Sequence, residues 1–158
     1  MRWSLQICKG LEHVHSCNVF QADISPANVL LDWEDNAKLS DFAGSSIDGC
    51  EPLVLPSLHS ERPRWPSSSP TVKSELFALG YTLYEIETTT KPYHDKDDSQ
   101  VLQLFHKDVF PGTEKIVLGQ IIQNCWFGRY QSVTEVVVDI EQVHDRQEVS
   151  PAPVSIIE

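Results

Sequence analysis

The sequence has few basic residues and no long hydrophobic run. Its 12 Lys and Arg residues stand against 23 Asp and Glu residues, for a net charge of −11, which argues against nucleic acid or an anionic membrane as the main partner. No apolar run approaches the roughly 18 residues that a membrane span needs. The first residues lack the apolar core of a secretory signal. We therefore expect a cytoplasmic or nuclear protein that is not secreted.

Cysteines are few and widely spaced, and no two of them form a C-x-x-C pair. They are Cys8, Cys17, Cys50 and Cys125. Free thiols in a reducing compartment are the simplest interpretation of such a set. His13 and His15 are two residues apart, so on a helix they would point to different faces and make a poor metal-binding pair. With 158 residues, 41% of them hydrophobic and 22% charged, the chain suits one globular domain or one large lobe.

Two short apolar runs enclose a turn rich in Asp and Asn, which is the pattern of a tight β-hairpin. The runs are residues 29–31 and 37–39. Asp23 and Asn28 precede the hairpin and Asp41 follows it, so its two ends would bring three oxygen ligands to one rim. Such ligands suit a hard cation such as Mg²⁺. The alternative is that these residues are only turn and cap residues, as Asp and Asn often are.

This stretch resembles the catalytic loop and the metal-binding loop of protein kinases. The family pattern is His-Arg-Asp-x-x-x-x-Asn, followed after two strands by Asp-Phe-Gly. Here Gln21-Ala22-Asp23 stands for His-Arg-Asp, Asn28 keeps the asparagine spacing, and Asp41-Phe42-Ala43 stands for Asp-Phe-Gly. Asp-Phe alone would be a weak signal. The ordered combination with an apolar hairpin between the motifs is much more specific.

The most apolar segment, residues 70–88, predicts a buried helix because hydrophobic side chains cover more than one face. Thr71 is placed as its N-cap. The segment resembles the central helix of the kinase C-terminal lobe, which opens with Asp-x-Trp-Ser-x-Gly, and residues 75–80 fit with Glu for Asp and Phe for Trp. In the family that acid holds the catalytic-loop backbone, a supporting role that the resemblance gives to Glu75.

Four further helices are expected, at residues 2–16, 99–107, 115–124 and 132–143. The first would bury one face formed by Trp3, Ile7, Leu11 and Val14. The resemblance implies a mainly α fold with a small β-hairpin, a kinase-like C-terminal lobe that lacks the N-terminal lobe. We expect this lobe to span residues 2–144 and a flexible C-terminal tail to span 145–158.

A long irregular stretch rich in Ser, Pro and Gly follows the hairpin over residues 45–69. By position it corresponds to the activation segment of the family, which ends in Ala-Pro-Glu, and residues 62–66 are an approximate counterpart of that ending. The family Arg that pairs with this Glu is also replaced, because Tyr130 stands at about its position. Loss of both partners is self-consistent, since a lone buried charge would be costly.

The resemblance implies a phosphotransfer site that uses ATP and Mg²⁺. Asp23 would accept the proton of the substrate hydroxyl, and Asn28 and Asp41 would hold the metal on the phosphates. Phe42 and Glu75 would support the loops. Ser25 stands where serine/threonine kinases carry a loop Lys, so no loop cation would reach the transferred phosphate.

Two hypotheses about function follow. In the first, the chain is a protein kinase domain fragment that acts on Ser, Thr or Tyr of protein substrates and is inactive alone. The sequence holds no Gly-rich phosphate loop, no strand Lys for the phosphates and no helix Glu to pair with it, so activity would require a supplied N-terminal lobe. In the second, the chain is a pseudokinase-like module that binds a protein partner without catalysis.

Overall fold

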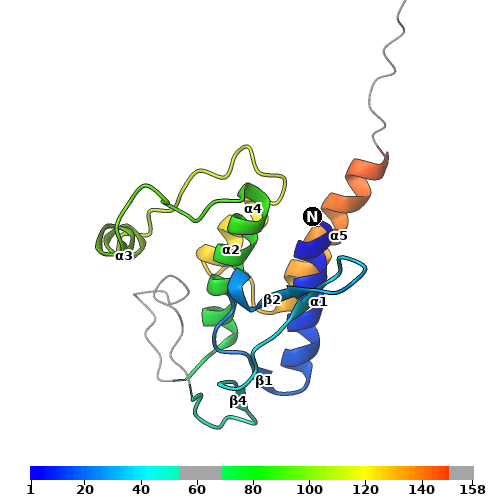
Figure 1. Ribbon diagram of the computed structural model, residues 1–158. Coiled ribbons are helices and arrows are strands. Elements are labelled where there is room, and N and C mark those ends of the chain that lie inside the picture. The colour runs from blue at the N-terminus through cyan, green and yellow to red at the C-terminus, as the bar shows by residue number, and fades with distance from the viewer. Residues whose placement is uncertain (54–68, 150–158) are drawn as a thin grey trace, which may run out of the picture.

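The computed structural model describes residues 1–53 and 69–149 (Figure 1). These residues form five α-helices, one short 3₁₀ helix and two antiparallel sheets of two strands each. The helices are α1 (Arg2–Ser16), α2 (Val72–Thr88), α3 (Asp98–His106), α4 (Gly119–Trp126) and α5 (Val133–Val149). The strands are β1 (Val19–Phe20), β2 (Val29–Leu31), β3 (Ala37–Leu39) and β4 (Ser46–Ile47). This mainly helical lobe with a small hairpin confirms the fold class predicted from the sequence.

The hairpin has the bounds that the sequence predicts. Strand β2 pairs with β3 in the register Val29 to Leu39, Leu30 to Lys38 and Leu31 to Ala37. Strand β4 was not expected, because two residues are too few to show an alternating pattern. It pairs Ile47 with Val19 of β1 and so ties the start of the irregular stretch to the segment after α1. Residues 54–68, which include the approximate counterpart of Ala-Pro-Glu at 62–66, lie outside the described residues.

Helix α2 forms the centre of the hydrophobic core. Residues 75–83 are all buried, as the sequence predicts for a helix that is apolar nearly all round. The predicted N-cap is confirmed: Thr71 Oγ1 accepts a hydrogen bond from the Ser74 N–H, and the Ser74 hydroxyl accepts one from the Thr71 N–H. Because the N-cap residue has an extended backbone, the helix begins at Val72 rather than at residue 70.

Helices α4 and α2 pack closely, and Gly80 makes the approach possible. A Cβ at Gly80 would lie 2.8 Å from Cys125 Cβ and 3.0 Å from Trp126 Cδ1. Helix α4 begins later than the sequence predicts, at Gly119 instead of residue 115. The intervening residues form successive tight turns, in which the N–H groups of Ile116 and Gly119 bond to carbonyls three residues earlier.

Helices α1 and α5 lie side by side on the other side of the core (Figure 1). Ile7 and Leu11 are buried on α1, as predicted, but Trp3 is 41% exposed and packs outside the core. Helix α5 continues to Val149, past residue 144, which was expected to be the last residue of the lobe. Where the lobe ends therefore stays a prediction. Within residues 1–53 and 69–149, every helix is too short or too polar to cross a bilayer.

Candidate functional site

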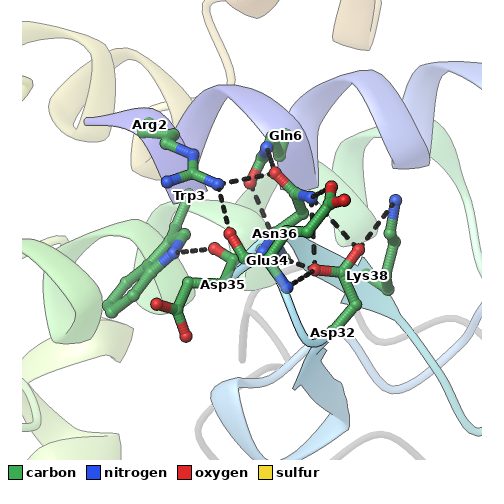
Figure 2. A network of polar contacts seen from close by, with 9 residues as sticks. Arg2, Trp3, Gln6, Asp32, Glu34, Asp35, Asn36 and Lys38 are labelled. Carbon is green, nitrogen blue, oxygen red and sulfur yellow. Dashed lines mark hydrogen bonds and ion pairs between the residues drawn. The ribbon is translucent and has the colours of Figure 1, made fainter.

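The turn of the hairpin is fastened to the first turns of α1, which fixes the position of the whole hairpin (Figure 2). The Arg2 guanidinium donates to the Glu34 carbonyl at 2.8 Å and to Asn36 Oδ1 at 2.6 Å. Gln6 donates to Asn36 Oδ1 at 2.9 Å and accepts from the Ala37 N–H at 2.9 Å. The turn is therefore held against α1, and this contact also fixes the position of the opposite, open end of the hairpin.

Asp32 stabilises the turn through hydrogen bonds to the backbone of the turn itself. Its Oδ1 accepts hydrogen bonds from the N–H groups of Glu34 and Asn36, both at 2.9 Å. The hydrogen bond from the Asn36 N–H is the main cause that holds the pKa of Asp32 below its ordinary value. The Glu34 N–H and the Lys38 ammonium, which lies 3.7 Å from Asp32 Oδ2, lower this pKa further. The bonded form of the turn is therefore the one with an ionised Asp32.

Asp23 and Asn28, at the open end of the hairpin, are in direct contact. Asn28 Nδ2 donates to the Asp23 backbone carbonyl at 2.8 Å and to Asp23 Oδ2 at 3.0 Å. The 3₁₀ helix Pro26–Asn28 sets this spacing, with Pro at its first position and an extended Ser25 before it. Because Nδ2 makes both bonds, Oδ1 faces away from Asp23 and is the atom that can coordinate a cation.

Asp41 is brought to the same end by the buried side chain of Gln21. Gln21 Nε2 donates to the carbonyls of Ser40 at 3.0 Å and Asp41 at 3.2 Å, and Gln21 Oε1 accepts from the Asp23 N–H at 2.8 Å. Ser40 adds a second connection, because its N–H and hydroxyl both donate to the Asn28 carbonyl at 2.9 Å. The three predicted ligand residues thus belong to one hydrogen-bonded unit.

The two residues of the Asp-Phe pair lie at the surface. Asp41 is exposed and has a φ of +56°, in the left-handed region that non-glycine residues rarely adopt. Phe42 is 38% exposed, and its carbonyl accepts a hydrogen bond from the Ser45 N–H at 3.1 Å. The hydrogen bond from Gln21 that places Asp41 is therefore made to its backbone carbonyl, while the residue itself is exposed.

Glu75 supports the other side of the loop from the first turn of α2. Only 3% exposed, it accepts a hydrogen bond on Oε1 from the Ala22 N–H at 2.6 Å. Its Oε2 lies 2.5 Å from His15 Nε2 at the end of α1. Ala22 has a φ of +72°, an unfavourable conformation for a residue with a Cβ, so this bond holds the backbone where it would not otherwise stay.

Sequence reasoning missed two members of this unit, Gln21 as a bridge and His15 as the partner of Glu75. In the sequence, Gln21 stands only as the counterpart of the His in His-Arg-Asp, and His15 only as half of a poor metal-binding pair with His13. The available signal was the Gln21 amide itself, because a Gln in a tight loop has both a donor and an acceptor to satisfy.

The donor chemistry fits Mg²⁺. Asp23 and Asp41 provide carboxylates and Asn28 an amide oxygen, and such hard oxygen ligands suit a cation that keeps waters and phosphate oxygens as its remaining ligands. Residues 1–53 and 69–149 contain no group of three or more His, Cys, Asp or Glu side chains that could enclose a metal alone.

Comparison with known proteins agrees with this arrangement. The family model of the protein kinase domain matches residues 1–126. A probable serine/threonine-protein kinase of Streptomyces coelicolor is 25% identical over 94% of this chain and 25% of its own length. The serine/threonine-protein kinase PknB of Mycolicibacterium smegmatis is 24% identical over 89% of this chain and 25% of its own. The proto-oncogene serine/threonine-protein kinase mos of Rattus norvegicus is 26% identical over 82% of this chain and 42% of its own.

The chain thus spans between a quarter and less than half of the length of these relatives. The family match covers the hairpin, the loops that flank it and helices α1 to α4. It includes each of the residues that the geometry joins into one unit.

Proposed function

Because the chain belongs to the protein kinase domain family, we propose that it carries the proton acceptor and the metal ligands of a phosphotransfer site. The observation that supports this most is the hydrogen-bonded unit around Gln21, in which Asn28 contacts Asp23 and the Asp41 backbone is held beside both. Residues that served only as turn caps would bond within their own turns, whereas here the Gln21 side chain reaches across 19 and 20 residues of sequence to the carbonyls of Ser40 and Asp41.

Each residue has a defined task in this proposal. Asp23 accepts the proton of the substrate hydroxyl, and its carboxylate is held toward the site by Asn28. Asn28 Oδ1 and the Asp41 carboxylate hold Mg²⁺, which would supply charge neutralisation at the ATP phosphates. Glu75 and Gln21 keep the two loop backbones in place. Phe42 supports the turn that follows Asp41.

The substrate class we propose is Ser or Thr of proteins, with ATP as the phosphate donor. The relatives named above are all called serine/threonine-protein kinases, which supports Ser or Thr as the acceptor. The net charge of −11 favours a basic protein surface as the substrate and disfavours nucleic acid and anionic membranes.

We further propose that the isolated chain does not turn over. Phosphoryl transfer depends on cations that neutralise the developing charge, and Lys38 is the single Lys or Arg from residue 21 to residue 53. Its ammonium lies 3.7 Å from Asp32 Oδ2, in the turn of the hairpin and away from the Asp23 end. This observation also supports the second candidate, a pseudokinase-like module that binds a protein without catalysis.

Phosphate transfer from radiolabelled ATP to a generic protein substrate tests the proposal. The chain alone is expected to give no incorporation above the Asp23→Asn variant. Turnover that Asp23→Asn abolishes would contradict the proposed inactivity. A thermal shift with Mg²⁺ and ATP tests ligand binding separately. We expect stabilisation that is lost in Asp41→Asn, and no shift in the parent chain would favour the interaction module.

A further inference from the structure

We propose that the turn of the hairpin, residues 32–36, is a docking surface for a basic segment of another protein, and that the partner covers the exposed indole of Trp33. This turn lies at the end of the hairpin opposite Asp23 and Asn28. Docking there is therefore separate from the proposed phosphotransfer site and does not depend on whether the chain transfers phosphate. Three properties of the turn support this role: its exposed apolar side chains, its rigid backbone and its charge.

Trp33 occupies the tip of the turn and points into solvent. The Asp35 N–H donates to the Asp32 carbonyl at 3.0 Å, which makes Trp33 and Glu34 the two central residues of a β-turn. Gly, Pro and small polar residues dominate such positions. The Trp33 side chain is fully exposed, at 105%, so it adds nothing to the core and its whole apolar surface is available to a partner.

Two more apolar side chains are exposed beside the turn. Leu31, the last residue of β2, is 50% exposed. Trp3 is 41% exposed, and its indole N–H donates to the Asp35 carbonyl at 2.8 Å (Figure 2). Single exposed apolar side chains are common on protein surfaces, but several around one feature indicate an interaction site. Trp is also among the residue types that contribute most to binding between proteins.

The backbone of the turn is already ordered, so a partner would not have to order it. Asp32 bonds to two backbone N–H groups of the turn, and Arg2 and Gln6 of α1 both bond to the Asn36 side chain. A surface that is ordered before binding loses less conformational entropy when the partner arrives. The turn thus presents Trp33 on a backbone whose position is fixed.

The charges of the turn favour a basic partner. Glu34 and Asp35 are exposed, and Figure 2 shows the Asp35 carboxylate pointing away from the hydrogen-bonded network. The cations beside the turn, Arg2 and Lys38, are both engaged within it. With a net charge of −11, the chain repels a second copy of itself, nucleic acid and anionic membranes. A segment that combines Lys or Arg with aliphatic side chains matches both the carboxylates and Trp33.

Fluorescence anisotropy of labelled synthetic peptides tests this surface on the full chain. The probe peptide carries a run of Arg residues followed by Leu-Gly-Leu. One matched peptide has Glu in place of each Arg, and a second has Gly in place of each Leu. We expect the parent chain to bind the probe peptide and to bind each matched peptide about 10-fold more weakly or less, because each one lacks half of the recognised chemistry.

Variants of the chain locate the binding on the turn. Trp33→Ala should weaken binding of the probe peptide about 30-fold, as loss of an aromatic anchor commonly does. Because Trp33 is fully exposed, this variant should keep the urea midpoint of the parent chain, so its loss of binding would not reflect unfolding. A double variant, Glu34→Gln with Asp35→Asn, should bind more weakly and with a smaller dependence on salt. Val117→Ala is the matched control: Val117 is 51% exposed in the turns before α4, and the affinity should not change.

Several results would overturn the inference. They are equal affinities of the parent and Trp33→Ala chains for the probe peptide, equal binding of the Arg and Glu peptides, or no binding of the probe peptide by the parent chain. Sedimentation of the parent chain, alone and with phosphatidylcholine vesicles, examines the other occupants. Self-association or vesicle binding that Trp33→Ala abolishes would assign the surface to a second copy or to lipid instead of to a basic protein segment.

Discussion

The Glu75 carboxylate accepts a hydrogen bond from the backbone N–H of Ala22, 53 residues earlier in the chain, at 2.6 Å. Glu75 lies in the most deeply buried segment of α2, and Ala22 immediately precedes Asp23. This hydrogen bond ties the loop that holds the proposed proton acceptor directly to the core. His15, 2.5 Å from the other carboxylate oxygen, adds α1 to the same support.

Replacing Glu75 with Leu is expected to destabilise the fold by about 3 kcal/mol or more, because it leaves the Ala22 N–H and the His15 ring without their buried partner. Glu75→Gln should cost much less, since it keeps an acceptor for Ala22. The midpoint of urea unfolding at constant slope measures both. Glu141→Leu is the matched control: Glu141 pairs with Lys9 at 2.6 Å on the surface, and such pairs contribute about 1 kcal/mol or less. Equal losses for Glu75→Leu and Glu141→Leu would contradict this account.

Replacement of Gly80 or Gly10, each within a helix, by Ala should change the stability of the fold in opposite directions. At Gly80 the added Cβ would lie 2.8 Å from Cys125 Cβ, so α2 and α4 must separate, at a cost of about 1–3 kcal/mol. At Gly10 in α1 the nearest atom, Leu39 Cδ1, is 3.4 Å away, and the better helix propensity of Ala should stabilise by up to about 1 kcal/mol. Thermal or urea unfolding of the two variants measures the sign of each change in the free energy of unfolding. A Gly80→Ala variant as stable as Gly10→Ala would show that the close approach of α4 is not needed.

Local patterns in the sequence predict local structure well here. The hairpin bounds follow from two apolar runs around an Asp/Asn turn, and the start of α2 follows from Thr71. Trp3 shows where periodicity fails, because its position on the apolar stripe predicts burial while its indole N–H is bonded to the Asp35 carbonyl at 2.8 Å outside the core. The Gln21 bridge and the Glu75 bond to His15 join residues between 19 and 60 positions apart. Such pairs are set by tertiary packing, which no local pattern records.

The hairpin turn should loosen in acid. Hydrogen bonds from the Asn36 and Glu34 N–H groups lower the pKa of Asp32 in the folded chain. Its contribution is therefore complete above the unfolded pKa of about 3.9 and is lost as the pH falls through the lower folded pKa. The Trp3 indole N–H, which bonds to the same turn, should report the change as an NMR shift as the pH is lowered below about 4.

The Asp32→Asn variant should lose this acid transition, because its amide cannot take up the proton. Asp35→Asn is the matched control, since Asp35 contributes its backbone carbonyl to the network (Figure 2) and its transition should remain. A Trp3 shift that persists in Asp32→Asn would assign the acid response to another group.

Two of the four thiols should react quickly, and the other two should be protected. All four cysteines are free; Cys17 and Cys50 are exposed, and Cys8 and Cys125 are buried. Burial raises the pKa of both buried thiols, with Glu12 adding to the effect at Cys8 and Cys8 adding to it at Cys125. Because the thiolate is the reactive form, a disulfide reagent near pH 8 should modify two thiols quickly in the folded chain and all four in denaturant.

A variant with Cys17→Ser and Cys50→Ser should therefore lose the fast phase entirely, and a fast phase that persists would place Cys8 or Cys125 at the surface. The slow phase carries further information, because Cys125 packs against Gly80 where α2 and α4 approach most closely. Its labelling rate measures how often that contact opens. Gly80→Ala forces the two helices apart, so it should speed the labelling of Cys125 in the folded chain, while Gly10→Ala should slow it or leave it unchanged.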